Sequence, residues 1–253
     1  MNHYDVSVLP SEARYWMMII GAVVSGFLLV KYFDNLSQEK REPYLKRLGC
    51  ALLLTASFLP VYTILIPEHL FSYHRSLPLH FCSLNIWLIG FNCFFRSRKL
   101  FVYTFFMGLI GGFYSVLTPL LTVGDAPLVM IHYVIVHTSL FAVPIIMIRL
   151  YGMRLKYYDW IRGYLFAAAI STVMVFINSF LNLYVENTGG ASANYMFVTV
   201  APAVSNPFLF DGLKWPFYLI PIHFGLCLHM LFINMIYRKR EKNAIVTNPQ
   251  LWQ

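Results

Sequence analysis

Seven long apolar stretches divide this chain of 253 residues. A helix needs about 20 mostly apolar residues to cross a hydrocarbon core of about 30 Å, and inside that core only helices and closed barrels satisfy their backbone hydrogen bonds. We therefore expect an all-α membrane protein, a bundle of seven transmembrane helices that forms a single domain over residues 1–253. The expected spans are residues 14–33, 48–67, 78–95, 101–123, 128–150, 161–185 and 216–237.

Basic residues gather in alternate loops between these stretches. The formal net charge is +8, and all but three of the 19 Lys and Arg residues lie on one expected side of the bundle. Cytoplasmic loops attract such an excess, so we expect the amino terminus outside and the carboxyl terminus inside. The charge is then a determinant of topology, with contact to anionic lipid as a second effect, and nucleic acid is not an expected partner. The three basic residues on the outer side are Arg14, Arg75 and Lys214.

The longest outer segment, residues 186–215, is unusually apolar for an exposed loop. It holds the stretch Asn194-Tyr195-Met196-Phe197-Val198 and, at its end, Trp215. Non-helical backbone at membrane depth must be covered by protein or line a wet cavity. We expect a partly buried lid over the outer end of the bundle, either on the membrane surface or folded back between the helices.

Polar side chains of four expected spans, together with that outer segment, collect in the outer half of the bundle. At a rise of about 1.5 Å per residue, His80 and Cys82 begin the third span, while His132 and His137 lie roughly 6 and 14 Å along the fifth. Polar residues at such depths usually face the bundle interior or a cavity, so the pattern predicts a shared interior site. Its candidate members are His80, Cys82, His132, His137, Asn178, Asn182, Asn194, Tyr195, Trp215 and His223.

Most of these residues also have a simpler structural interpretation. Histidines near span ends, here His80 and His132, can lie among lipid headgroups. A buried cysteine such as Cys82 commonly packs as a small apolar residue. Asparagines four positions apart, such as Asn178 and Asn182, can bond helices together, and the aromatic residues Tyr195 and Trp215 can belong to an interfacial belt.

Angles around a helix restrict the pairing of these groups. On a regular helix His80 and Cys82 point roughly 200° apart, so they cannot form a close pair unless the helix start is irregular. A thiolate needs a nearby base or positive field near neutral pH, and His137 is our first candidate for the base of Cys82. His223 and Cys227, four positions apart on one face, form a second candidate pair.

Metal binding is the main chemical alternative. Histidines that converge from different helices can hold zinc or haem. However, the sequence has no H-E-x-x-H motif and no acidic residue inside an expected span. Seven-helix zinc amidases of the ceramidase type combine histidines with an intramembrane acid. We therefore expect neither a metal nor a cofactor.

At Leu77-Pro78-Leu79-His80-Phe81-Cys82 the chain resembles the YwaF-type bacterial membrane proteins and their eukaryotic relatives of the transmembrane protein 164 type. His137, the stretch 194–197 and the stretch 215–218 support the resemblance, which covers roughly residues 75–237. It implies a multi-pass protein of the bacterial plasma membrane. It also implies acyl transfer on phospholipids through a cysteine acyl-enzyme and a histidine, as associated with the eukaryotic relatives.

The order of the key residues departs from that pattern. In the eukaryotic relatives the cysteine directly precedes the histidine, whereas here Leu79 stands at that position. Cys82 is then either a displaced equivalent, or the chain has no cysteine chemistry.

The expected function is a lipid-modifying acyltransferase or transacylase that acts on outer-leaflet phospholipid. In this hypothesis Cys82 attacks an ester, His137 or His80 moves the proton, and Asn178 or Asn194 stabilises the oxyanion. The alternative is a non-enzymatic lipid- or small-ligand-binding membrane protein or transporter, in which the same residues form a polar cavity without a nucleophile. Membrane lipids are the expected partners in either case, and the sequence leaves the oligomeric state open.

Overall fold

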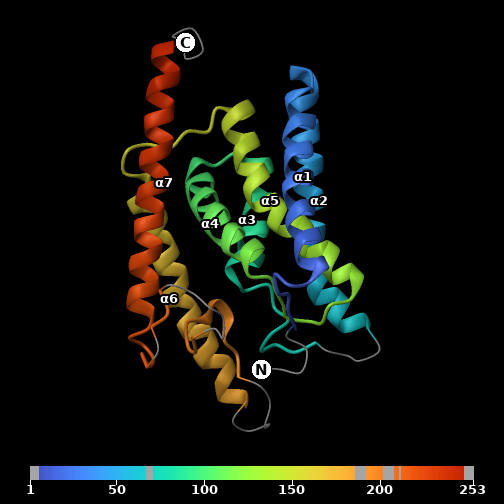
Figure 1. Ribbon diagram of the computed structural model, residues 1–253, viewed down its shortest axis with the longest axis vertical. Coiled ribbons are helices and arrows are strands. Elements are labelled where there is room, and N and C mark those ends of the chain that lie inside the picture. Colours follow the sequence, from blue (N-terminus) through green and yellow to red (C-terminus); the bar gives the residue numbers. More distant parts are fainter. Residues whose placement is uncertain (1–5, 67–70, 186–191, 202–207, 211, 248–253) are drawn as a thin grey trace.

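The computed structural model describes residues 6–66, 71–185, 192–201, 208–210 and 212–247. These residues form seven α-helices, two short strands and one 3₁₀ turn, η1 (Figure 1). The elements are β1 (Val6–Ser7), α1 (Ala13–Asp34), α2 (Gln38–Leu65), α3 (Phe81–Phe95), α4 (Arg98–Leu117), β2 (Leu120–Leu121), α5 (Pro127–Tyr151), α6 (Asp159–Val185), η1 (Tyr195–Phe197) and α7 (Leu219–Thr247).

Six of the helices are long and apolar enough to cross a membrane, so the chain is an integral membrane protein with an all-α fold. The exception is α3, which has 15 residues and spans only about 22 Å at 1.5 Å per residue. The seventh crossing and the outside position of the amino terminus therefore stay predictions.

Each expected span lies on one helix, and the differences are at the helix ends. The third span begins at Phe81 and not at residue 78, because His80 has the extended dihedral angles φ −70° and ψ 154°. The fourth ends at Leu117, after which β2 pairs antiparallel with β1 near the amino terminus. Helix α5 begins at Pro127, whose fixed φ suits a first turn, and ends at Gly152 with φ +67°, a common helix stop.

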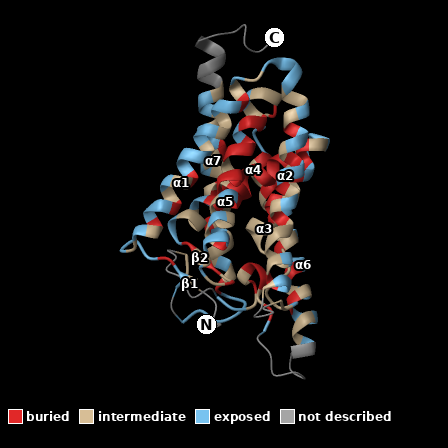
Figure 2. Cartoon of the chain, turned by 90° about the vertical axis from the view of Figure 1, so that its right-hand side faces the viewer, coloured by how far each residue is buried: buried red, intermediate tan, exposed pale blue. Residues whose placement is uncertain are grey.

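The centre of the bundle is formed by α4 and α5. In each of them 56% of the most apolar window is buried, against 17–22% in α1, α2, α6 and α7. Figure 2 shows the buried residues concentrated around α4 and α5, with the outer helices largely exposed. Large apolar side chains such as Phe27, Phe176 and Phe232 are exposed on those outer helices, as expected of surfaces that face lipid acyl chains.

Small residues let α4 approach its neighbours closely. A Cβ atom at Gly108 would lie 2.4 Å from the carbonyl oxygen of Leu140, and one at Gly112 would lie 2.6 Å from the ring of Phe141. These two glycines therefore pack α4 directly on α5, as small residues commonly do between membrane helices. Gly111 points elsewhere, because a Cβ atom there would meet only the sulfur of Cys82, at 3.8 Å.

Ion pairs join the loops at the end of the bundle that we expect to face the cytoplasm. Arg98 pairs with the fully buried Asp159, and Arg149 Nη2 lies 2.8 Å from Asp34 Oδ2. These pairs connect the start of α4 to the start of α6, and the end of α5 to the end of α1. The basic loops predicted to share one side thus meet at one end of the bundle.

Candidate functional site

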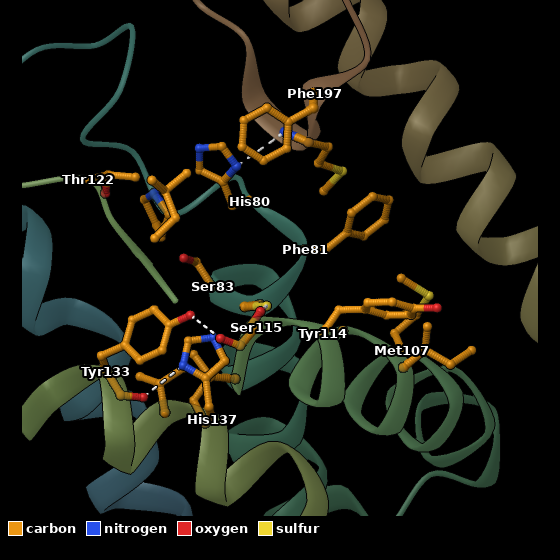
Figure 3. A pocket seen from close by; sticks show the side chains of 18 of the residues that line it. His80, Phe81, Ser83, Met107, Tyr114, Ser115, Thr122, Tyr133, His137 and Phe197 are labelled. Carbon is orange, nitrogen blue, oxygen red and sulfur yellow. Dashed lines mark hydrogen bonds between the residues drawn. The ribbon is translucent and has the colours of Figure 1, made fainter. Parts of the chain in front are cut away.

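A cavity of about 440 Å³ lies at the other end of the bundle, between α2, α3, α4, α5, α6 and α7. Its wall is mostly apolar, with a small number of polar groups, which is the usual composition of a site for a small or lipid-like ligand. Figure 3 shows the side chains of α3, α4 and α5 that face it. The structure brings together five of the ten candidate residues in this wall: His80, Cys82, His132, His137 and His223.

The thiol of Cys82 contacts α4. Its Sγ atom lies 3.4 Å from Ser115 Oγ, within reach of a hydrogen bond in which either group can donate. Gly111, one turn before Ser115, faces the same sulfur, and a Cβ atom there would lie 3.8 Å from it. Ser115 is held in turn through its backbone, since the Tyr133 hydroxyl donates to its carbonyl oxygen at 2.7 Å.

His137 is buried and has a defined protonation pattern. Its Nδ1 atom lies 2.7 Å from the carbonyl oxygen of Tyr133, one turn earlier in α5. A carbonyl can only accept, so Nδ1 carries the proton and Nε2 keeps the free lone pair of a base. The imidazole packs on the Tyr133 ring, with 3.9 Å between centroids, and Figure 3 shows it directed toward Ser115.

The pairing of Cys82 with His137 remains a prediction. Among the described residues, the hydrogen bond of the Cys82 thiol goes to Ser115, and none joins Cys82 or His80 to His137. Catalytic hydrogen bonds are often long before substrate binds. The three groups Cys82, Ser115 and His137 face the same cavity.

His80 faces the cavity because it precedes the first helical turn. The 200° separation from Cys82 holds only on a regular helix, and the extended backbone at His80 removes it, so both side chains line the cavity. The backbone N–H of Met196 donates to His80 Nδ1 at 3.3 Å. The imidazole also packs between the rings of Tyr195 and Phe197, with centroid distances of 5.2 and 5.3 Å.

The asparagines of α6 hold the stretch 193–200 and do not line the cavity. The amide of Asn178 makes two bonds of 3.0 Å to the backbone N–H and carbonyl of Tyr195. Asn182 does the same for Ala193, at 2.6 and 3.1 Å. A side-chain amide matches a peptide group in this way, so each asparagine satisfies non-helical backbone that would otherwise be buried unpaired.

Tyr195, Asn194 and Trp215 complete this anchoring. Burial raises the pKa of Tyr195 to about 12, so the hydroxyl keeps its proton at neutral pH and donates to the Tyr73 carbonyl at 2.8 Å. Asn194 Oδ1 accepts from the backbone N–H of Val200 at 3.1 Å, and Trp215 Nε1 donates to the Val198 carbonyl at 2.9 Å. The side chains of this stretch that line the cavity are those of Met196, Phe197 and Val198.

The other two candidate histidines of the wall, His132 and His223, have partners on other helices. His132 Nε2 donates to the Thr55 carbonyl at 2.9 Å, which ties α5 to α2. His223 Nε2 lies 3.4 Å from Ser171 Oγ, between α7 and α6. Cys227, proposed as a partner for His223, is not among the described residues that line the cavity.

The sequence model of the TMEM164 family matches residues 9–234, which include all of the cavity wall described above. The chain belongs to the TMEM164 family. This confirms the resemblance to proteins of the transmembrane protein 164 type. No curated protein and no solved structure matches the chain.

Several polar residues of this TMEM164-family cavity were not predicted from the sequence, among them Tyr114, Ser115, Tyr133 and His229. One signal for His229 was available, because a histidine deep in a membrane span is rare and commonly faces the interior. The hydroxyl residues gave no such signal, since serine and tyrosine are ordinary in membrane helices. Their positions follow from how α4 and α5 are rotated against α3.

Metal ligation finds no support in the placement of these side chains. In the described parts of the chain no group of three or more His, Cys, Asp or Glu residues lies close enough to hold a metal ion. The histidines of the cavity instead bond to carbonyl, hydroxyl and backbone N–H groups.

Proposed function

We propose that this TMEM164-family protein is an acyltransferase or transacylase that moves an acyl chain from a phospholipid through a thioester on Cys82. One observation carries the proposal: a thiol, a hydroxyl and an imidazole with a free Nε2 share the wall of an apolar cavity among membrane helices. Cysteine nucleophiles are activated by an adjacent base, and the base is oriented by a third group. Here the carbonyl of Tyr133 is the orienting group for His137.

The chemistry runs in two balanced steps. In the first, His137 Nε2 takes the Cys82 proton while the sulfur attacks the ester carbonyl, and the expelled alcohol oxygen takes the proton back from His137. This leaves the acyl chain on sulfur and a neutral imidazole. In the second, His137 takes the proton of an acceptor hydroxyl, the oxygen attacks the thioester, and the departing sulfur of Cys82 receives that proton.

Ser115 replaces the asparagines as donor to the oxyanion in this proposal. Asn178 bonds to the backbone of Tyr195, and the Asn194 oxygen accepts from backbone N–H groups, so neither amide is directed into the cavity. The Ser115 hydroxyl already lies 3.4 Å from the sulfur. A donor at that place is close to the oxygen on which charge develops when sulfur attacks a carbonyl.

Arg75 supports a phospholipid as the donor. It is the charged residue in the described part of the cavity wall, and it lies in the loop before α3. A guanidinium group can bind a phosphate through two parallel hydrogen bonds, while the apolar wall suits the acyl chains. From the distribution of basic loops we further propose that this end opens toward the outer leaflet. The resemblance to bacterial membrane proteins favours the plasma membrane of a bacterium.

One observation favours the alternative, a lipid-binding protein without catalysis. The hydrogen-bond partner of the Cys82 thiol is a hydroxyl and not an imidazole, and a serine hydroxyl does not stabilise a thiolate as a base or a positive charge does. In this alternative the cavity binds the lipid, and Cys82 is a packing residue.

Replacement of Cys82 by alanine separates the two functions. With the protein in bilayers of defined phospholipids, we expect Cys82→Ala to lower acyl transfer by roughly 10²-fold or more, because the proposed acyl-enzyme forms on its sulfur. The measurement is mass analysis of the lipids over time. Cys227→Ala is the matched control, since that cysteine lies outside the described cavity wall. Transfer by Cys82→Ala at the wild-type rate would remove the nucleophile from the proposal. Retained lipid without turnover in any variant would favour the binding protein.

A further inference from the structure

The cavity has a second polar end, which the chemistry above does not use. There the Tyr114 hydroxyl lies 3.1 Å from His229 Nε2, a contact between α4 and α7. Both residues line the cavity, as do His223 and Ser171 nearby on α7 and α6. Figure 3 shows Tyr114 extending away from Ser115 and His137, toward the opposite side of the cavity.

His229 has the same protonation pattern as His137. Its Nδ1 atom lies 2.7 Å from the carbonyl oxygen of Gly225, one turn earlier in α7. Nδ1 must therefore donate, and Nε2 accepts the proton of the Tyr114 hydroxyl. Both protons of the pair are then engaged, so the pair offers the oxygen of Tyr114 as a hydrogen-bond acceptor, without a fixed charge. Such a site suits the O–H group of a neutral alcohol, whereas the guanidinium group of Arg75 in the same wall is of the kind that suits the anionic phosphate of a lipid.

Two consecutive residues of α4, Tyr114 and Ser115, lie at the two polar ends of the cavity. Ser115 contacts the Cys82 thiol, and Tyr114 contacts His229, about 100° away around the same helix. The wall between them is open at Gly111, where an added Cβ atom would meet only the Cys82 sulfur. A molecule bound at Tyr114 can therefore extend along the same cavity to the sulfur that would carry the acyl chain.

We propose that Tyr114 and His229 form the acceptor subsite: they bind the hydroxyl-bearing molecule that receives the acyl chain and direct it at the Cys82 thioester. The proposal rests on the acyl transfer proposed above, in which His137 moves the proton. Tyr114 and His229 decide which nucleophile meets the thioester, an alcohol bound at their end or water. A purely structural role is the alternative, because the same bond also ties α4 to α7.

The division of the acyl chain between transfer to an alcohol and hydrolysis by water tests whether Tyr114 and His229 form this subsite. We expect Tyr114→Phe and His229→Gln to load Cys82 at the wild-type rate but to lower the ratio of transfer to hydrolysis about 10-fold. The first removes the oxygen that accepts from the alcohol and the second removes the imidazole that orients this oxygen, so water competes better. The probe is a phospholipid donor with a long-chain alcohol as acceptor, in bilayers. Intact-protein mass reports the loading step, and lipid mass reports the two products.

Tyr151→Phe is the matched control. It also removes a hydroxyl that joins two helices, the 2.6 Å bond to the Arg41 carbonyl, but it does not line the described cavity. The subsite is wrong if Tyr114→Phe partitions acyl chains as Tyr151→Phe does, or if loading and transfer fall together, as a structural defect predicts. Absence of loading in the wild type itself shows instead that the proposed acyl transfer fails, and the subsite with it.

Discussion

Replacement of His137 by glutamine is expected to lower acyl transfer by roughly 10²- to 10⁴-fold, the usual contribution of a positioned general base. Glutamine keeps a polar group of similar size but cannot take the proton of the Cys82 thiol. The imidazole is well placed for that step, because its Nδ1 proton is held by the Tyr133 carbonyl and its Nε2 lone pair is free. The rate is measured by lipid mass analysis in bilayers.

His74→Gln is the control for this substitution. Its Nε2 atom bonds to the Leu181 carbonyl at 3.2 Å, and its side chain does not line the described cavity. We expect it to retain near wild-type activity. If His137→Gln kept more than a tenth of the wild-type rate while remaining folded, another group would have to be the base, and His80 would be the next candidate.

Replacement of Asn178 by leucine is expected to destabilise the protein by roughly 2–6 kcal/mol. Leucine has a similar volume, but it leaves the N–H and carbonyl of the fully buried Tyr195 without their partners. Each unpaired buried polar group costs about 1–3 kcal/mol. Because Tyr195 anchors Met196 and Phe197 in the cavity wall, we also expect the wall to open more often. Thermal unfolding measures the first effect, and the rate of Cys82 alkylation measures the second.

Asn234→Leu separates local opening from general destabilisation. Asn234 is buried in α7 and donates to the Tyr157 carbonyl at 2.8 Å, at the opposite end of the bundle. It should lower the unfolding temperature without accelerating alkylation of Cys82. Equal alkylation rates in the two variants would show that the stretch 193–200 does not control access to the cavity.

The sequence was a good guide to the helices and to the depth of polar groups. Apolar length placed all seven helices, with errors at the ends where proline, extended backbone or a short strand stops a span early. Depth alone gathered His80, His132, His137 and His223 near one end, and all four line the cavity. Depth along a helix follows directly from position in the chain, so it needs no knowledge of the partners.

The rotation of each helix about its axis and the conformation of the loop around Tyr195 could not be predicted from the sequence in this way. Asn178 and Asn182 share a face of α6, but the backbone groups to which they hydrogen-bond belong to a loop. Two non-glycine residues of that loop have positive φ, Met196 at 59° and Phe197 at 54°. That conformation is stabilised by the tertiary contacts of Tyr195, which no local pattern reveals. For the same reason Ser115 and Tyr114 became visible only when α4 was seen packed against α3, α5 and α7.

The intact mass of the purified protein, after incubation with phospholipid and no acceptor, shows whether Cys82 carries the acyl chain. We expect a mass increase equal to one acyl chain, mapped to Cys82, removed by hydroxylamine as a thioester should be, and absent in Cys82→Ala. Acyl transfer that proceeds with no adduct on Cys82, under conditions in which His137→Gln is inactive, would contradict the proposed thioester.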